Sequence, residues 1–122
     1  MDNEHINYKE IDHKCIPLVK YFNSIGLSTK YSCQGHDNCN NNTFWIMFDD
    51  MVQDNDIAYF ITTITHHSNN RNYASCGMFM KWCRIYDDEV HYNWMYKIDF
   101  GYHKKNWAVA DADLRYFESY YK

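Results

Sequence analysis

The most distinctive chemical feature of the sequence is the segment at 32–36, which reads Ser-Cys-Gln-Gly-His and is soon followed by Cys39. Cys33, His36 and Cys39 have the spacing C-x2-H-x2-C, and zinc accepts thiolate and imidazole ligands. A zinc site needs a fourth ligand, which one of the two later cysteines or another histidine could supply. Only one half of the usual paired zinc signature is present, so a metal site is one of three interpretations.

The other two interpretations of this segment involve no metal. In one, Cys33 is a nucleophile and His36 or a remote histidine is its base, which requires a cation or a helix N-terminus to stabilise the thiolate. In the other, the motif is architectural: Cys33 is a small buried group, and Gln34 and His36 hold a turn or form hydrogen bonds to a ligand. Gly35 permits the sharp turn that this requires. The architectural interpretation requires the fewest assumptions, because it needs neither a fourth metal ligand nor a group that stabilises a thiolate.

A second group of candidates combines arginines with aromatic rings. The only arginines are Arg71, Arg84 and Arg115, and the planar guanidinium group is suited to binding phosphate. Arg84 is expected to share a strand face with Trp82, which would place a stacking ring beside a phosphate-binding group. Arg115 follows Asp111 by four residues, so an ordinary surface ion pair is the simpler role for Arg115 taken alone. Arg71 lies in an Asn-rich stretch and is interpreted as a solvated charge.

The usual signatures of nucleotide-processing enzymes are missing from the sequence. It contains neither GxxxxGK[ST] nor GxGxxG, and it has only four glycines. Neighbouring carboxylates such as Asp111 and Asp113 are interpreted as capping or solubility groups. His36-Asp37 is a single H-D pair, whereas metal-dependent phosphodiesterases carry more than one such element. We therefore expect a binding protein that is not an enzyme and that holds no cofactor.

Length and composition limit the class of protein further. The chain has 122 residues and a net charge of −4, which predicts a single α+β ligand-binding domain over 1–122 and argues against binding of long nucleic acids. Aromatic residues make up 19% of the chain. With few leucines, the core must be built largely from rings and isoleucine. The remaining rings are expected to line a pocket or an interface, unless AT-rich coding alone explains their number.

The elements that must position these residues can be expected from periodicity. They are a helix at about 12–24 with Pro17 in its first turn, strands at 27–33 and 43–48, a helix from Asp54 or Asp56 to His66-His67, strands at 74–86 and 90–102 joined by Asp87-Asp88-Glu89, and a helix from about Asn106 to the end. The order α-β-β-α-β-β-α predicts an α+β fold around a mostly antiparallel sheet. The apolar strand at 43–48 is expected to be central and covered on both faces.

The expected cellular environment follows from the N-terminus and the cysteines. The first residues are acidic and polar, unlike a signal peptide, and no apolar run approaches the length of about 20 residues that a membrane span needs. Five cysteines are an odd number. We therefore expect a cytoplasmic protein with reduced thiols and no contact with membranes.

One segment resembles a known family. Residues 16–36, IPLVKYFNSIGLSTKYSCQGH, resemble the opening of small phage-encoded proteins with an apolar helix, an N-x-x-G-[LI]-x-T step and an S-C-x-G-H motif. In size, aromatic content and element order the chain is similar to the first type of Thoeris anti-defence protein. The sequence resemblance is confined to this segment. Over the rest of the chain, the similarity is one of size, aromatic content and element order.

The resemblance implies a binder without catalysis that sequesters cyclic ADP-ribose isomers made by bacterial TIR-domain proteins. Some members of that family also hold cyclic trinucleotides at separate sites. The resemblance further implies action in the cytoplasm of the bacterial host, as a homodimer that some members assemble into a hexamer, with pockets near the subunit interface.

Such a ligand has an adenine base to stack on a ring, phosphates to bind cations, and ribose hydroxyls that suit amide groups. The expected ligand-binding residues are Trp82 and Trp94 for stacking, Arg84 and Arg115 for phosphates, and Gln34, His36 and Asn93 for hydroxyls and base edges. The alternative function is a zinc-dependent nucleotide hydrolase or a zinc-binding protein built on Cys33, His36 and Cys39. A phage protein that inhibits a host enzyme by direct contact is a third possibility.

Overall fold

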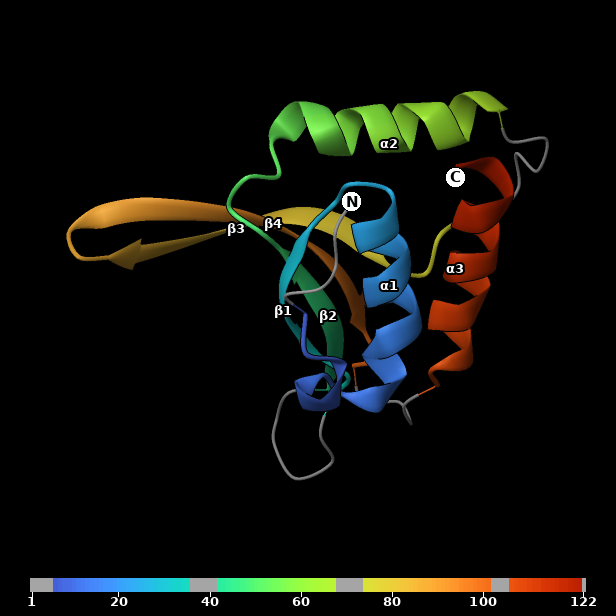
Figure 1. The fold of residues 1–122 in the computed structure, drawn as a ribbon, viewed down its shortest axis with the longest axis horizontal. Helices are drawn as coiled ribbons and strands as arrows, with labels where there is room; N and C mark the ends of the chain where they lie inside the picture. The colour runs from blue at the N-terminus through green and yellow to red at the C-terminus, as the bar shows by residue number, and fades with distance from the viewer. Residues whose placement is uncertain (1–5, 36–41, 68–73, 102–105, 122) are drawn as a thin grey trace.

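In the computed structural model, which describes residues 6–35, 42–67, 74–101 and 106–121, the helices and strands follow the expected order (Figure 1). The elements are α1 (Ile16–Ser24), β1 (Thr29–Cys33), β2 (Thr43–Phe48), α2 (Asp54–His67), β3 (Met78–Tyr86), β4 (Glu89–Asp99) and α3 (Ala108–Tyr120), with short 3-10 helices at Tyr8–Glu10 and His13–Cys15. All strand pairs are antiparallel, and the spatial order is β1-β2-β4-β3. The predicted α+β fold is confirmed.

The core lies between one face of the sheet and the helices, and rings dominate it. Phe22 of α1 is completely buried, and its ring contacts rings from both other helices and from three strands. These rings belong to Phe48, Phe60, Phe79, Tyr96 and Phe117. Ring pairs at these separations and tilts add stabilisation to the burial of apolar area. The expectation of an aromatic core in a leucine-poor chain is therefore correct.

Several element boundaries differ from the expected ones for local reasons. The α-helix begins at Ile16, after a 3-10 turn, and Pro17 lies in its first turn, where its missing N–H costs no hydrogen bond. The helix expected from Asn106 begins at Ala108, with Trp107 as its N-cap residue, and the Asn106 side chain accepts a hydrogen bond from the backbone N–H of Ala108 at 3.2 Å. The strand expected to begin at residue 74 begins at Met78, because the preceding backbone is bound by a side chain instead of by a neighbouring strand.

That side chain is Asp113, and our interpretation of it as a solvated or capping group is wrong. Asp113 of α3 is completely buried. Its carboxylate accepts hydrogen bonds from the backbone N–H groups of Cys76 at 2.9 Å and Gly77 at 2.8 Å, and from the Tyr96 hydroxyl at 2.5 Å. A β-carbon at residue 77 would overlap the Tyr96 ring, so glycine is required there. One carboxylate thus joins α3 to the entrance of β3 and to β4.

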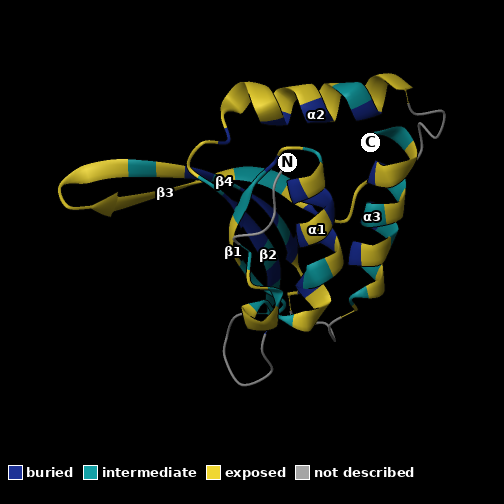
Figure 2. Ribbon diagram, in the orientation of Figure 1, coloured by how far each residue is buried: buried dark blue, intermediate teal, exposed yellow. Residues whose placement is uncertain are grey.

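The hairpin of β3 and β4 extends beyond the helices (Figure 1), and its outer part is exposed (Figure 2). Its turn consists of Asp87 and Asp88, whose φ angles of 55° and 60° are those of a type I′ turn. Glu89, expected in the loop, is the first residue of β4. Residues 81–90 are all exposed. We call residues 81–92 the arm.

Candidate functional site

The sheet face opposite the core contains a hollow of about 380 Å³ whose lining comes entirely from the four strands. The lining residues are Tyr31, Thr43, Trp45, Met47, Met80, Trp82, Arg84, Met95 and Lys97. They occupy alternate positions on each strand, because successive side chains point to opposite faces of a sheet. We call this the open-face hollow. β2 is central, as predicted, but among the described residues helices cover only one of its faces, and the hollow lies on the other.

Strand register gives the hollow an apolar floor. Met47, Met95 and Met80 are directly opposite one another across β2, β4 and β3, and the first two are buried. Thioether side chains are flexible and polarizable, so they adapt to flat or irregular ligands. Trp45 stands on one side of this methionine row and Trp82 on the other. Trp82 is 41% exposed, which leaves part of its ring available.

Two cations flank the hollow. Arg84 follows Trp82 by two residues on the same face of β3, a rise of about 7 Å, and its guanidinium carbon is 5.9 Å from the centroid of the Tyr86 ring. Lys97 of β4 is directly opposite Trp45, at the other end. The chain is acidic as a whole, so these two cations give the hollow a local charge opposite to that of the molecule.

Of the two tryptophans proposed for stacking, only Trp82 lines this hollow. Trp94 lies on the opposite face of the sheet, where it packs against the core, and its indole N–H donates to the Asp54 carboxylate at 2.8 Å. Lys81 pairs with the same carboxylate at 2.8 Å. The hydrogen bond from Lys81, followed by that from Trp94, lowers the pKa of Asp54 below its ordinary value of 3.8. Trp94 thus helps to attach α2 to the sheet.

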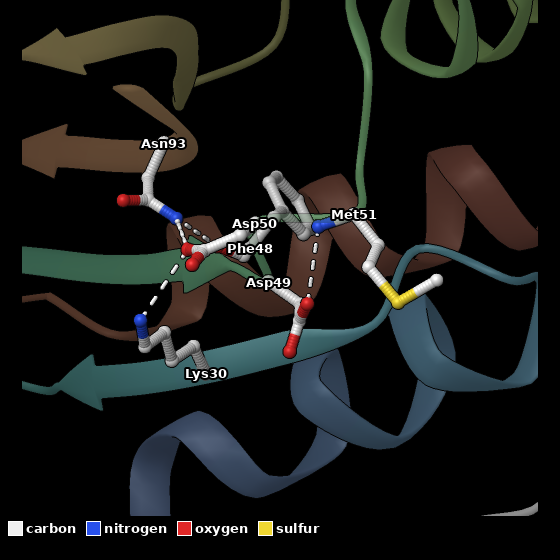
Figure 3. A network of polar contacts seen from close by, with 6 residues as sticks. All are labelled: Lys30, Phe48, Asp49, Asp50, Met51 and Asn93. Atoms are coloured by element: carbon white, nitrogen blue, oxygen red, sulfur yellow. Dashed lines mark hydrogen bonds and ion pairs between the residues drawn. The ribbon is translucent and has the colours of Figure 1, made fainter. Parts of the chain in front are cut away.

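Asn93 is opposite Trp82, but it is only 4% exposed and its amide is used within the fold (Figure 3). The amide nitrogen donates to the Phe48 carbonyl at 3.0 Å and to the Asp50 carboxylate at 2.7 Å. Lys30 binds the same carboxylate oxygen at 3.3 Å. The hydrogen bond from Asn93, followed by that from Lys30, lowers the pKa of Asp50 below its ordinary value of 3.8. In the structure, Asn93 therefore connects β4 to the end of β2.

Gln34 also has a structural role. Its side-chain oxygen accepts from the backbone N–H of Lys14 at 2.9 Å, and its backbone N–H donates to the Asp12 carboxylate at 3.0 Å. Its carbonyl accepts from the Trp107 indole at 3.0 Å. These bonds connect the end of β1 to the chain before α1 and to the start of α3, a structural role like that in the architectural interpretation, although Cys33, expected to be buried, is only half-buried. His36 lies outside the described residues.

Arg115 is exposed on α3, which packs on the core face of the sheet. The open-face hollow is on the other face, so within one chain Arg115 and Arg84 do not share a site. Arg71 lies outside the described part of the chain. Of the two arginines that the structure describes, only Arg84 lines the hollow.

The cysteines do not converge in the part of the chain that the structure describes. Cys33 is on β1 at one edge of the sheet, whereas Cys76 and Cys83 are exposed near and on β3 at the other edge. No group of three potential metal ligands occurs among the described residues, but His36 and Cys39 lie outside them. Burial, helped by Asp12, raises the pKa of Cys15 from 9.0 to about 12, so this thiol stays protonated and unreactive at neutral pH.

Sequence reasoning missed most of the hollow. The residues not anticipated are Tyr31, Thr43, Trp45, Met47, Met80, Met95 and Lys97. The signal was present as a two-residue period: Trp45 and Met47 alternate with the buried Phe44, Ile46 and Phe48. What the sequence lacked was the pairing register that brings the alternating positions of four strands together.

The fold and the hollow define a small α+β protein with an aromatic, cationic, ligand-sized recess on the open face of an antiparallel sheet. The chain belongs to the YoqC prophage protein family, which it matches over residues 2–117, so it is phage-encoded. Searches of curated proteins and of solved structures found no match. Among the described residues, every helix is too short or too polar to cross a membrane.

Proposed function

We propose that this protein is a phage anti-defence protein that binds a cyclic ADP-ribose isomer, the signal made by bacterial TIR-domain proteins, and sequesters it without cleaving it. The observation that carries this proposal is the combination of Trp82 and Arg84 in one ligand-sized hollow. Membership of a prophage protein family supports a role in the contest between phage and host. The resemblance of residues 16–36 to the first type of Thoeris anti-defence protein supports the choice of ligand.

The chemistry of the hollow matches that of a small nucleotide. Its volume of about 380 Å³ falls within the range of about 300–1,000 Å³ that is usual for ligand sites. An adenine base could stack on Trp82 above the methionine floor, and its phosphates could reach Arg84, two residues further along the strand. Stacking of one base on an aromatic side chain is worth about 1–3 kcal/mol. Thr43 and Tyr31 add hydroxyl groups for ribose.

The lining also favours binding over hydrolysis. None of the nine side chains is a carboxylate, an imidazole or a thiol, the groups that most often act as general acid, general base or nucleophile. A sequestering protein needs tight binding and slow release, which depend on buried contacts. We therefore propose that the nucleotide leaves the protein chemically unchanged.

The test uses the whole chain incubated with the products of a TIR-domain enzyme. After unbound nucleotides are removed, the protein is denatured by heat and the released molecules are identified by mass spectrometry. A cyclic ADP-ribose isomer of unchanged mass is expected. Recovery of a linear or hydrolysed nucleotide would indicate an enzyme, and retention of no nucleotide would refute the proposal.

Two substitutions test whether the hollow is the site. Trp82→Ala should weaken binding roughly 5- to 150-fold, the equivalent of the stacking energy, and Arg84→Ala should weaken it through loss of a phosphate contact. Lys81→Ala is the matched control, because Lys81 is the neighbouring cation on the same strand but faces the other side of the sheet. Isothermal titration calorimetry measures all three. Equal losses in R84A and K81A would place the ligand elsewhere.

A further inference from the structure

The end of the open-face hollow that meets the arm has a second basic side chain beside Arg84. His91 of β4 is directly opposite Arg84 of β3, and it lies an even number of positions before Met95 and Lys97, which line the hollow. Because alternate residues of a strand share a face, His91 and Arg84 both lie on the open face. Directly opposite residues have β-carbons about 4.5–5.5 Å apart. The imidazole and the guanidinium group are therefore neighbours at the rim of the hollow.

The contacts of His91 determine where its ring lies. The Nε2 atom is 3.3 Å from the Tyr86 carbonyl oxygen and 3.9 Å from the Glu89 carboxylate. The His91 ring centroid is 5.8 Å from that of Tyr86, and the Arg84 guanidinium carbon is 5.9 Å from the centroid of the same Tyr86 ring. Both basic side chains thus lie against one tyrosine.

The carbonyl of Tyr86 also determines which nitrogen of the neutral His91 ring carries the proton. A carbonyl oxygen only accepts hydrogen bonds, so Nε2 is the donor. In the neutral ring, Nδ1 is then an acceptor, which repels the oxygens of an anion. Protonation of the ring by water turns Nδ1 into a donor. His91 is therefore suited to bind an anion only when it is protonated.

The charged groups that face His91 come from three parts of the fold. Arg84 is opposite it on β3, Glu89 precedes it on β4, and Asp50 after β2 interacts with it electrostatically. Lys30 already pairs with Asp50 (Figure 3). The charges of Arg84 and Glu89 cancel when the ring is neutral, and one positive charge remains when it is protonated. The Glu89 side chain is 77% exposed, so an anion can displace it into solvent.

We propose that the diphosphate of the bound nucleotide lies between Arg84 and His91, and that His91 binds it in the protonated form. The identity of the ligand in this inference rests on the proposed function. The planar guanidinium group presents paired N–H donors to one phosphate, and the imidazolium presents a donor to the other. Trp82 precedes Arg84 by two residues on the same face, so a base stacked on it places the diphosphate beside this pair.

Binding in this form has a defined dependence on pH. The charge of an imidazole changes between about pH 5 and pH 8. A diphosphate diester has no proton to lose in this range, so a change in its affinity reports on the protein. Because the ligand binds the protonated form of His91, binding takes up a proton and becomes tighter as pH falls.

The first test is isothermal titration calorimetry with ADP-ribose, which carries the same diphosphate diester, at pH 6 and pH 8 and equal ionic strength. Wild type should bind roughly 2- to 5-fold more tightly at pH 6, as expected for an exposed ion pair. His91→Gln should bind equally at both pH values. His67→Gln, an exposed histidine of α2, is the matched control and should behave as wild type. Circular dichroism checks that all three chains are folded.

Three outcomes would overturn the proposal. They are a wild-type chain that does not bind ADP-ribose, a wild-type affinity that is the same at both pH values, and a pH dependence that persists in H91Q.

The second test removes the anion that competes for His91. Glu89→Gln should bind ADP-ribose roughly 2- to 5-fold more tightly than wild type at pH 8, because an exposed like charge beside the diphosphate is gone. Asp88→Asn removes the same charge from the adjacent turn position and is the matched control, with a smaller expected gain. Equal gains in E89Q and D88N would show that only the overall charge matters and would contradict the site.

These experiments separate this inference from the proposed function. If a cyclic ADP-ribose isomer is retained by the protein but ADP-ribose binds without pH dependence, the proposed function stands and the role of His91 is refuted. If ADP-ribose binds with the expected pH dependence but no cyclic nucleotide is retained, sequestration is refuted and the diphosphate site stands.

Discussion

At the scale of single residues, Asp113 has the largest structural role of any carboxylate that we describe. Its two oxygens accept three hydrogen bonds from groups in two other segments of the chain. Nothing in its spacing from Asp111 indicated this, because a helix position two residues away points in a different direction. The signal that would have helped is Gly77, a glycine at the entrance of a strand, where a close approach of another side chain is common.

Asp113→Asn should lower the free energy of unfolding by about 2–4 kcal/mol, because the amide turns one acceptor into a donor that faces backbone N–H groups. Asp111→Asn, a neighbouring and exposed position, is the matched control and should stay within about 0.5 kcal/mol of wild type. Urea denaturation followed by tryptophan fluorescence measures both. Similar stability in the two variants would contradict the role assigned to Asp113.

At the scale of elements, the network around Asp50 connects β1, the end of β2 and β4 through Lys30 and Asn93 (Figure 3). Asp54 attaches the first turn of α2 to β3 and β4 in the same manner. In both cases an exposed carboxylate after β2 binds side chains from neighbouring strands. The path of the chain from the sheet to α2 is thereby held at two points.

These contacts predict a pH dependence of stability. The folded pKa of Asp50 is below 3.8, so the unfolded chain binds protons more readily, and the stabilisation is fully present above about pH 4 and is lost as pH falls through the folded pKa. Asp50→Asn should remove part of the decline in melting temperature between pH 5 and pH 3. Differential scanning calorimetry of both chains at several pH values measures this decline. An unchanged pH dependence would show that the network contributes nothing to this decline.

At the scale of the whole molecule, one face of the sheet packs on the core, and the other carries the proposed binding site. The helices cover one face and bury the aromatic core, and rings and cations on the other face line the open-face hollow. The arm continues both faces beyond the helices. If the chain forms the homodimer that the family resemblance implies, folding and association are coupled, and stability depends on protein concentration.

The melting temperature of the wild-type chain should therefore rise with protein concentration. The reason is mass action, since dilution favours separated copies. Thermal unfolding over a hundredfold range of concentration provides the measurement. A wild-type melting temperature that is independent of concentration would argue against coupled folding and association.

The element order, the antiparallel sheet, the aromatic core and the shared face of Trp82 and Arg84 could all be predicted from the sequence. Each depends on local periodicity, which is a property of neighbours along the chain. The candidate site could be predicted only in part: Trp82 and Arg84 line the hollow, while Trp94 and Arg115 lie on the core side of the sheet. His36 lies outside the described residues, and Asn93 and Gln34 have partners within the fold.

The sequence by itself determined which residues alternate on each strand and therefore which could share a face. Only the tertiary structure decided which alternating sets meet, because the pairing of β2 with β4, and not with the next strand along the chain, depends on long-range contacts. That pairing brings Trp45 and Met47 beside Met95 and Met80. It also leaves β3 at an edge of the sheet.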